Sequence, residues 1–238
     1  MYDFGIKGSA YKHVSDLRLF TPGTLCNVKD ISLMVPRRGL CAFQSIVWSD
    51  EDFLLTVTDN PLFHKEGPLD IIRMKVELEG IPSDNIGVQL IGLVEDDDRN
   101  MKADILLDCE YIHVQGKTAQ AIWVEIKVPA HTCPGTYNGI IKFFRHKMFC
   151  NEELESELTF QITVAPVTLP PPSEYNFYLD LWQHTSNIAR KHGVTLWTDK
   201  HFAIIEEYVK TLGELGQKAV TVIASEIPWS GQRSHRDL

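Results

Sequence analysis

Residues 175–184 read Tyr-Asn-Phe-Tyr-Leu-Asp-Leu-Trp-Gln-His, and this stretch decides how the rest of the chain is interpreted. Its apolar and aromatic positions alternate as in a buried strand, and a tryptophan, an amide and an imidazole then follow in a row. In (β/α)8 barrels the C-terminal ends of the strands carry the chemistry. Because the stretch follows a proline-rich segment, it predicts the first strand of such a barrel.

The chain before this stretch shows the two-residue alternation of strands with one buried and one solvated face. In residues 120–128, for example, Trp123, Glu125 and Lys127 form the polar face. Turn residues separate the segments and no helical pattern interrupts them, which favours an antiparallel β-sandwich. The predicted strands are 31–35, 40–48, 54–58, 71–78, 120–128 and 158–164. The side chains expected on the inner faces include Val76, Ile122, Val124, Phe160 and Ile162.

After the stretch the hydrophobic period changes to between three and four residues. Residues 185–192 and 201–212 predict helices, and residues 218–224 predict a second strand, so that strand, helix and strand form a right-handed βαβ unit. A complete barrel takes about 250 residues. We therefore expect a mainly β chain whose parts are an antiparallel β-sandwich at 1–168, a proline-rich linker at 169–173 and an incomplete βαβ portion of a (β/α)8 barrel at 174–238.

Composition and charge narrow the classes of partner. The formal net charge of −9 disfavours nucleic acid and anionic membranes, because both are bound through basic patches, and it suits a neutral ligand such as a sugar. No apolar run reaches the roughly 18 residues of a membrane helix, and no signal-peptide pattern is visible at the start. The five cysteines are irregularly spaced, so they are expected to be reduced, as in a cytoplasmic protein.

The sequence shows no motif for a metal or a cofactor. Residues 95–98 are acidic, but they lack the spacing of a calcium loop and predict a solvated turn. The histidines and cysteines have no zinc-site spacing, and no glycine-rich phosphate loop is found. His131 and Cys133 lie close in sequence without the further partners of a cysteine nucleophile. We therefore expect no metal site and no cofactor.

Several motifs resemble those of the glycoside hydrolase family 123-like proteins, which are bacterial proteins with an N-terminal β-sandwich and a (β/α)8 catalytic domain. The resemblance covers about residues 40–232, and residues 233–238 depart from it, which suggests a truncated chain. The motifs in the barrel part are Asp180-Leu181-Trp182-Gln183, 197–202, 216–218 and Pro228-Trp229-Ser230-Gly231-Gln232. The motifs in the sandwich part are 120–124, 128–130 and 134–139.

The resemblance implies an enzyme similar to exo-acting β-N-acetylgalactosaminidases, and hence an N-acetylhexosamine-type glycan as the ligand. Such enzymes retain configuration by using the 2-acetamido group of the substrate itself. An adjacent Asp–Glu pair assists, in which Asp orients the acetamido group and Glu is the general acid. That pair belongs to a later barrel strand, which this chain lacks. No catalytic residue is therefore assigned, and the chain by itself is expected to be inactive.

Two tryptophans predict where the substrate binds. Trp182 and Trp229 should lie at the C-terminal ends of consecutive barrel strands, where an aromatic ring can stack on a pyranose. The alternative is that both rings fill the core. Asp180 should point into the barrel, where an unpaired carboxylate costs several kcal/mol and therefore needs a partner. The polar side chains expected to bind hydroxyl groups are Gln183, His184, Glu226 and Gln232.

A second class of function stays open at this point: a non-catalytic carbohydrate-binding or interaction β-sandwich with 174–238 as a docking segment. In an incomplete barrel, apolar side chains such as Phe177, Leu179 and Val220 lack neighbours, and each one left exposed forfeits about 1.5–3 kcal/mol. Unpaired strand edges also invite association. We therefore expect 174–238 to be poorly ordered, packed onto the sandwich, or buried against a second copy of the chain.

Overall fold

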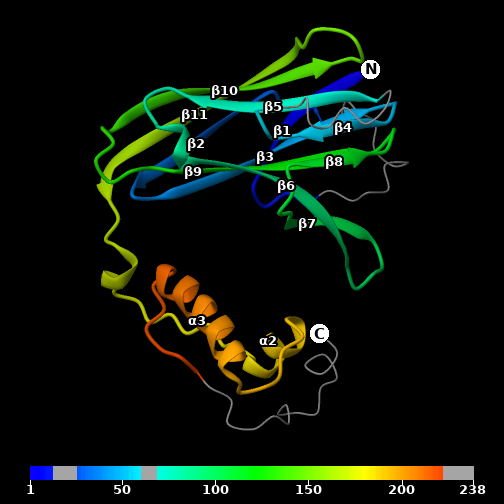
Figure 1. Ribbon diagram of the computed structural model, residues 1–238. Coiled ribbons are helices and arrows are strands. Elements are labelled where there is room, and N and C mark those ends of the chain that lie inside the picture. The colour runs from blue at the N-terminus through cyan, green and yellow to red at the C-terminus, as the bar shows by residue number, and fades with distance from the viewer. Residues whose placement is uncertain (13–25, 60–68, 222–238) are drawn as a thin grey trace. The chain divides into compact units, whose positions relative to one another are not determined.

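The computed structural model describes residues 1–12, 26–59 and 69–221, and it divides into two compact units, Met1–Leu169 and Pro170–Leu238 (Figure 1). The chain is mainly β, as the sequence predicts. Strands fill the first unit, and the α-helices of the described residues lie in the second. Within the described ranges, no helix is long and apolar enough to cross a membrane. Each unit is considered by itself.

The first unit consists of two β-sheets (Figure 1). The five-stranded sheet is antiparallel throughout, and its order is β1 (Tyr2–Gly8), β3 (Leu40–Ser49), β9 (Ala119–Lys127), β6 (Ile86–Glu95) and β7 (Met101–Leu106). The six-stranded sheet has the order β2 (Asp30–Arg37), β11 (Glu153–Thr168), β10 (Gly135–His146), β5 (Asp70–Leu78), β4 (Phe53–Thr56) and β8 (Tyr111–Val114). It is mixed, because β2 pairs with β11 and β4 with β5 in parallel.

The predicted strand segments correspond to β2, β3, β4, β5, β9 and β11, and the antiparallel expectation is confirmed for the five-stranded sheet. The sequence analysis did not predict β1, β6, β7, β8 and β10. In β10 the reason is visible, because Ile140-Ile141 and Phe143-Phe144 place apolar side chains on both faces and obscure the alternation. A register shift between Phe143 and Phe144 disturbs it further.

The hydrophobic core of the first unit draws on strands of both sheets. The predicted inner residues Ile122, Val124, Phe160 and Ile162 are buried, and Val76 packs against the same core while partly exposed. Aromatic rings join the two sheets: the ring centroids of Phe43 and Phe160 are 5.0 Å apart, and those of Phe4 and Phe143 are 4.3 Å apart. The predicted inner face is therefore confirmed.

The outer face of the five-stranded sheet carries a second, smaller cluster, which the sequence analysis did not expect. Its buried members are Cys26, Ile46, Ile91, Ala103, Ala119 and Ala121, and Tyr11, Trp48 and Trp123 pack partly against them. Trp123 was expected on a solvated face, yet it belongs to this cluster. All five cysteines are free, and burial in this cluster raises the pKa of the Cys26 thiol to about 12.

The second unit contains helices α2 (Thr185–Lys191) and α3 (Asp199–Glu214), which confirms the two predicted helices. Residues 175–184, however, form no strand, and neither do residues 218–221, so the predicted strands are wrong for these residues. A strand depends on a ladder of hydrogen bonds to neighbouring strands. Here a single backbone hydrogen bond joins the two segments, from Lys218 N–H to Leu179 O at 3.2 Å. Residues 222–224 of the second predicted strand lie outside the described residues.

A buried histidine joins the two helices. His201 is completely buried, and its Nδ1 accepts a hydrogen bond from the backbone N–H of Trp197 at 3.1 Å. Its Nε2 therefore carries the proton and donates to the carbonyl oxygen of Thr185, at 2.9 Å, in the first turn of α2. Thr198 caps α3, because its side chain accepts from the backbone N–H of His201. The motif at 197–202 thus starts α3 and fixes it against α2.

Gly139 in β10 lies against the ring of Phe160 and leaves no room for a larger side chain. A Cβ atom on Gly139 would lie 2.1 Å from the ring of Phe160, its cross-strand partner. We expect Gly139→Ala to lower the free energy of unfolding by about 1–3 kcal/mol, because the buried ring must move in a packed core. Gly87→Ala is the matched control, since its nearest contact would be 3.7 Å. Urea denaturation measures both, and equal stabilities would contradict this contact.

His201 gives a prediction for the second unit. His201→Ala leaves the Trp197 N–H and the Thr185 carbonyl without their partner, and it should destabilise helix α3 by about 2 kcal/mol or more. The measurement is amide hydrogen exchange along α3. The exposed neighbour Lys200 provides the control, because Lys200→Ala should change the exchange free energies by no more than about 0.5 kcal/mol. The same exchange pattern in both variants would refute the proposed role of the imidazole.

Candidate functional site

Residues 179–181 and 217–221 lie side by side in the second unit, where the sequence analysis placed the first two barrel strands. The side chain of Gln217 replaces a regular ladder between them. Its Oε1 accepts from the backbone N–H of Leu181 at 3.2 Å, and its Nε2 donates to the carbonyl oxygens of Leu181 at 3.4 Å and Ala219 at 2.5 Å. One carboxamide therefore fixes the register of the two segments.

Asp180 has the partner that its expected position required. The hydroxyl oxygen of Thr221 lies 3.0 Å from one carboxylate oxygen of Asp180 and 2.9 Å from the other, so it donates to one of them at a time. Both residues are partly buried. Since the carboxylate is held by a residue of the neighbouring segment, this hydrogen bond serves to join the two segments.

The first three predicted substrate-binding residues, Trp182, Gln183 and His184, follow Asp180 after Leu181. The side chain of Trp182 is 62% exposed, so it does not fill a core within the described part of the second unit. Gln183 is partly exposed, and its Nε2 donates to the carbonyl oxygen of Leu181 at 3.4 Å. His184 occupies the N-cap position of α2, and its backbone carbonyl accepts from Asn187 and Ile188. These three residues therefore share one short segment before a helix.

The other three predicted residues, Glu226, Trp229 and Gln232, lie outside the described residues. The structure thus shows one segment of the predicted substrate site. Its surroundings are rich in exposed apolar side chains, which include Phe177, Tyr178, Leu181, Phe202 and Val220. Such a density of exposed apolar groups is typical of a surface that binds a ligand or another part of a protein.

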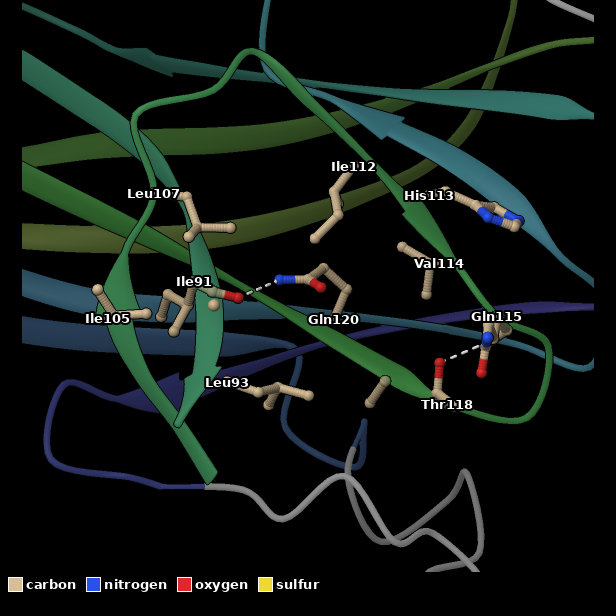
Figure 2. Close-up of a pocket in the computed structure, with 12 residues that line it drawn as sticks. Ile91, Leu93, Ile105, Leu107, Ile112, His113, Val114, Gln115, Thr118 and Gln120 are labelled. Atoms are coloured by element: carbon tan, nitrogen blue, oxygen red, sulfur yellow. Dashed lines mark hydrogen bonds between the residues drawn. The ribbon is translucent and has the colours of Figure 1, made fainter. Parts of the chain in front are cut away.

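The sandwich has a cleft of its own between the β6–β7 hairpin and β8 (Figure 2). Its volume is about 630 Å³, within the range of ligand-binding pockets. Side chains from strands β6, β7, β8 and β9 line it, among them Ile91, Ile105 and Ile112. It lies where β7 and β8, the edge strands of the two sheets, face each other. The lining is mixed, with apolar side chains beside the polar residues His113, Gln115, Thr118 and Gln120, which suits a ring that has an apolar face and polar groups.

A carboxamide enters this cleft from the inner face of β9. Gln120 is buried, and its Nε2 donates to the carbonyl oxygen of Ile91 at 2.6 Å (Figure 2). It also donates to the carbonyl oxygen of Ala121 at 2.8 Å. His113 stands at the rim and lies 3.2 Å from Asp52. The sequence analysis missed these residues. The sequence held a signal for Gln120. This residue lies on the same inward-facing side of β9 as Ile122 and Val124, where burying a polar side chain is unfavourable unless it forms hydrogen bonds.

The acidic run at 95–98 forms the turn that the sequence predicts. The carboxylate of Asp96 accepts from the backbone N–H groups of Asp98 at 3.0 Å and Asn100 at 2.8 Å, and it also pairs with Lys102. The hydrogen bond from Lys102 is the main cause that lowers the pKa of Asp96. Among the residues that the structure describes, no group of three or more His, Cys, Asp or Glu is placed to hold a metal ion.

Comparison with solved structures gives a strong likeness to a larger protein. A family 123 glycoside hydrolase from Clostridium perfringens, whose structural analysis concerns glycolipid glycan hydrolysis, matches with a TM-score of 0.72 and 17% identity. The match covers 92% of this chain and 37% of that one, so the chain spans little more than a third of its length. At this identity the likeness shows the fold.

Two further structures match more weakly. The N-terminal domain of PorA has a TM-score of 0.30 at 9% identity, and the match covers 69% of this chain and 99% of that one. A variant of the SrpA adhesin from Streptococcus sanguinis has a TM-score of 0.33 at 11% identity, with 82% and 76% covered. Scores this low carry no argument. A search of curated proteins gives no match.

Family models match both units of the chain. The N-terminal domain of glycoside hydrolase 123 matches residues 43–144, and the catalytic domain of glycoside hydrolase 123 matches residues 182–238. The first range lies within the sandwich, and the second begins at Trp182. Two domains of one family therefore follow each other in their expected order, and the chain belongs to the glycoside hydrolase family 123-like proteins.

Proposed function

We propose that this chain is the N-terminal part of a glycoside hydrolase that removes terminal N-acetylhexosamine residues from glycans with retention of configuration. The observation that carries the proposal is the match of the family's catalytic domain from Trp182 onward, together with the exposed ring of that residue. The relation of the similar Clostridium perfringens protein to glycolipid glycans supports a glycan as the substrate.

In the proposed reaction, the carbonyl oxygen of the substrate's 2-acetamido group bonds to the anomeric carbon while the bond to the leaving oxygen breaks. A general acid gives the leaving oxygen its proton. Water then attacks the same carbon and restores the acetamido group, and two inversions together retain the configuration. The residues of this chain bind the sugar. Trp182 stacks on its apolar face, and Gln183 and His184 hold its hydroxyl groups, with Glu226, Trp229 and Gln232 as the further contacts that we propose.

The Asp–Glu pair that the family resemblance requires is not assigned to any residue. An Asp directly precedes a Glu at one place in the sequence, Asp50-Glu51. These residues lie between β3 and β4 of the sandwich, and the Asp50 carboxylate pairs with the amino terminus of Met1, which lowers its pKa. A carboxylate engaged in this way, outside the catalytic unit, is not a candidate for orienting an acetamido group.

A non-catalytic role is the second candidate. The cleft of about 630 Å³ between β6, β7 and β8 favours it, because the sandwich then holds a ligand site without help from the second unit. In this alternative, the sandwich binds carbohydrate and residues 174–238 serve as a docking segment.

The proposal predicts sugar binding without turnover by these 238 residues. Chromogenic N-acetyl-β-galactosaminides should not be hydrolysed above background, because a positioned general acid alone accounts for about 10²–10⁴-fold of the rate. N-acetylgalactosamine should shift the Trp182 indole resonance in the NMR spectrum. Trp182→Ala should weaken binding at this site about threefold to tenfold, since an aromatic contact contributes about 0.5–1.5 kcal/mol.

Tyr178→Ala is the control for that experiment, because Tyr178 is an exposed aromatic residue in the same segment. Binding that depends equally on Tyr178 and Trp182 would argue against a specific site at Trp182. Turnover that Glu226→Gln abolishes would show that the catalytic carboxylate lies within this chain after all.

We also propose that the second unit mediates self-association of the 238-residue chain through its exposed apolar side chains. Sedimentation should show a mass that rises with protein concentration, and the double substitution Phe177→Glu and Val220→Glu should keep the chain monomeric, because a charge cannot be buried unpaired. Phe149→Glu is the control, since Phe149 is 91% exposed on the β10–β11 hairpin of the sandwich. A monomer at all concentrations, or dissociation by the control, would refute the proposal.

A further inference from the structure

A small cavity lies on the outer face of the five-stranded sheet, under the turn that follows β1. Its volume is about 190 Å³. Gln44 on β3 and Trp123 on β9 line its floor, and Lys12 and Asp104 also line it and pair with each other. Because Lys12 follows β1 at one edge of the sheet and Asp104 belongs to β7 at the other, the chain at 8–12 spans the sheet above the cavity.

Gln44 holds this turn with one end of its carboxamide. Its Nε2 lies 2.6 Å from the carbonyl oxygen of Tyr11 and 3.0 Å from that of Ser9, and it donates to both. An amide oxygen could not take this place, because it would face two carbonyl oxygens, so the orientation of the carboxamide is fixed. The residue is only 2% exposed. Its Oε1 is buried and has no hydrogen-bond partner among the described residues.

Trp123 presents the complementary group. Its indole Nε1 is also buried and has no partner within the part of the chain that the structure describes. Gln44 and Trp123 are direct cross-strand partners, so their Cβ atoms are about 4.5–5.5 Å apart. The cavity therefore holds an unpaired acceptor and an unpaired donor on neighbouring residues. Leaving such a buried pair unsatisfied costs about 1–3 kcal/mol for each group.

A β-bulge shapes the wall of the cavity. Leu93 pairs with Ala103 and Gly92 pairs with Ile105, so Asp104 is the extra residue in β7. A bulge re-aims side chains and is frequent beside binding sites. Ala103, Asp104 and Leu106 consequently line this cavity, while Ile105 lines the cleft between β6, β7 and β8. Ala103 is the small residue that leaves the space open.

The size and polarity of the cavity define its ligand. At roughly 30 Å³ per water molecule, the volume corresponds to about six waters, well below the 300–1,000 Å³ of drug-sized pockets. A hydroxyl group can accept from the Trp123 N–H and donate to Gln44 Oε1 at once. Lys12 and Asp104 neutralise each other, so the site does not select a charge. These properties suit one ring with several hydroxyl groups and an apolar face that packs against the indole.

We propose that this cavity binds a single neutral sugar ring, and that one of its hydroxyl groups bridges Trp123 Nε1 and Gln44 Oε1. The site lies wholly in the sandwich unit and does not depend on the proposed hydrolase activity. It gives the sandwich a ligand of its own, held by the roof at 8–12 and the floor of β3 and β9.

The test follows the indole N–H resonances of the five tryptophans in the 238-residue chain, assigned by single Trp→Phe substitutions. The probes are the methyl glycosides of glucose, galactose and N-acetylgalactosamine. At least one of them should shift the Trp123 resonance in a saturable way. Trp123→Phe removes the N–H and keeps an aromatic ring, and it should raise the Kd at this site about threefold to tenfold, as followed by resonances of the β1–β3 region.

Trp48→Phe is the matched control, because Trp48 packs on the same outer face but does not line the cavity, and it should leave the Kd unchanged. Glycerol tests the alternative that the cavity takes any small hydroxyl compound, and an equal shift with glycerol would overturn the proposal of a sugar ring. If no sugar shifts the Trp123 resonance, the proposal is overturned as well, and the cavity then holds water. Movement of Trp182 alone would support the proposed hydrolase while refuting this second site.

Discussion

The first half of strand β9 is buried on both of its faces, and much of the first unit depends on this burial. Its inner side chains Ile122, Val124 and Ile126 are completely buried in the core between the sheets. Its outer side chains are small at Ala119 and Ala121, so another part of the chain can approach closely. The turn after β1 approaches this face, and Gln44 binds the backbone carbonyls that the turn exposes. Close packing fills the inner face, whereas a polar anchor holds the outer cover and leaves a cavity beneath it.

Side-chain hydrogen bonds hold the second unit together, whereas the first unit is stabilised mainly by hydrophobic packing. Among its described residues, Ile188 and Ala189 are the buried apolar side chains, so the hydrophobic contribution there is small. Gln217 and the Asp180–Thr221 pair join its two extended segments, and His201 joins its two helices. Each of these groups satisfies backbone or carboxylate atoms that burial would otherwise leave unpaired. The described part of the unit is therefore held by side-chain hydrogen bonds, without the strand ladder and the burial that stabilise a barrel.

Sequence periodicity predicted strands that have one solvated face, such as β11, and it missed β10, where Ile140-Ile141 hides the period. The same rule predicted a strand at 175–184, but alternation reports only local preference, and the ladder needs partners elsewhere in the chain. In the two sandwich sites, Gln44 and Gln120 can be recognised in the sequence as polar residues within apolar strands. The bulge at Asp104 and the turn that crosses the sheet could not be predicted, because both depend on contacts between residues distant in sequence.

The two parts of the outer cavity relate differently to the family. The floor and wall residues Gln44, Trp123 and Asp104 lie within residues 43–144, which match the family's N-terminal domain. The roof at 8–12 lies outside that match and comes from the loop after β1, an edge strand paired to β3 from Tyr2 to Gly8. The ligand site that we infer thus combines the loop after β1 with residues of the matched N-terminal domain. The ion pair of Lys12 with Asp104 joins the roof to β7, while Gln44 and Trp123 provide the proposed recognition.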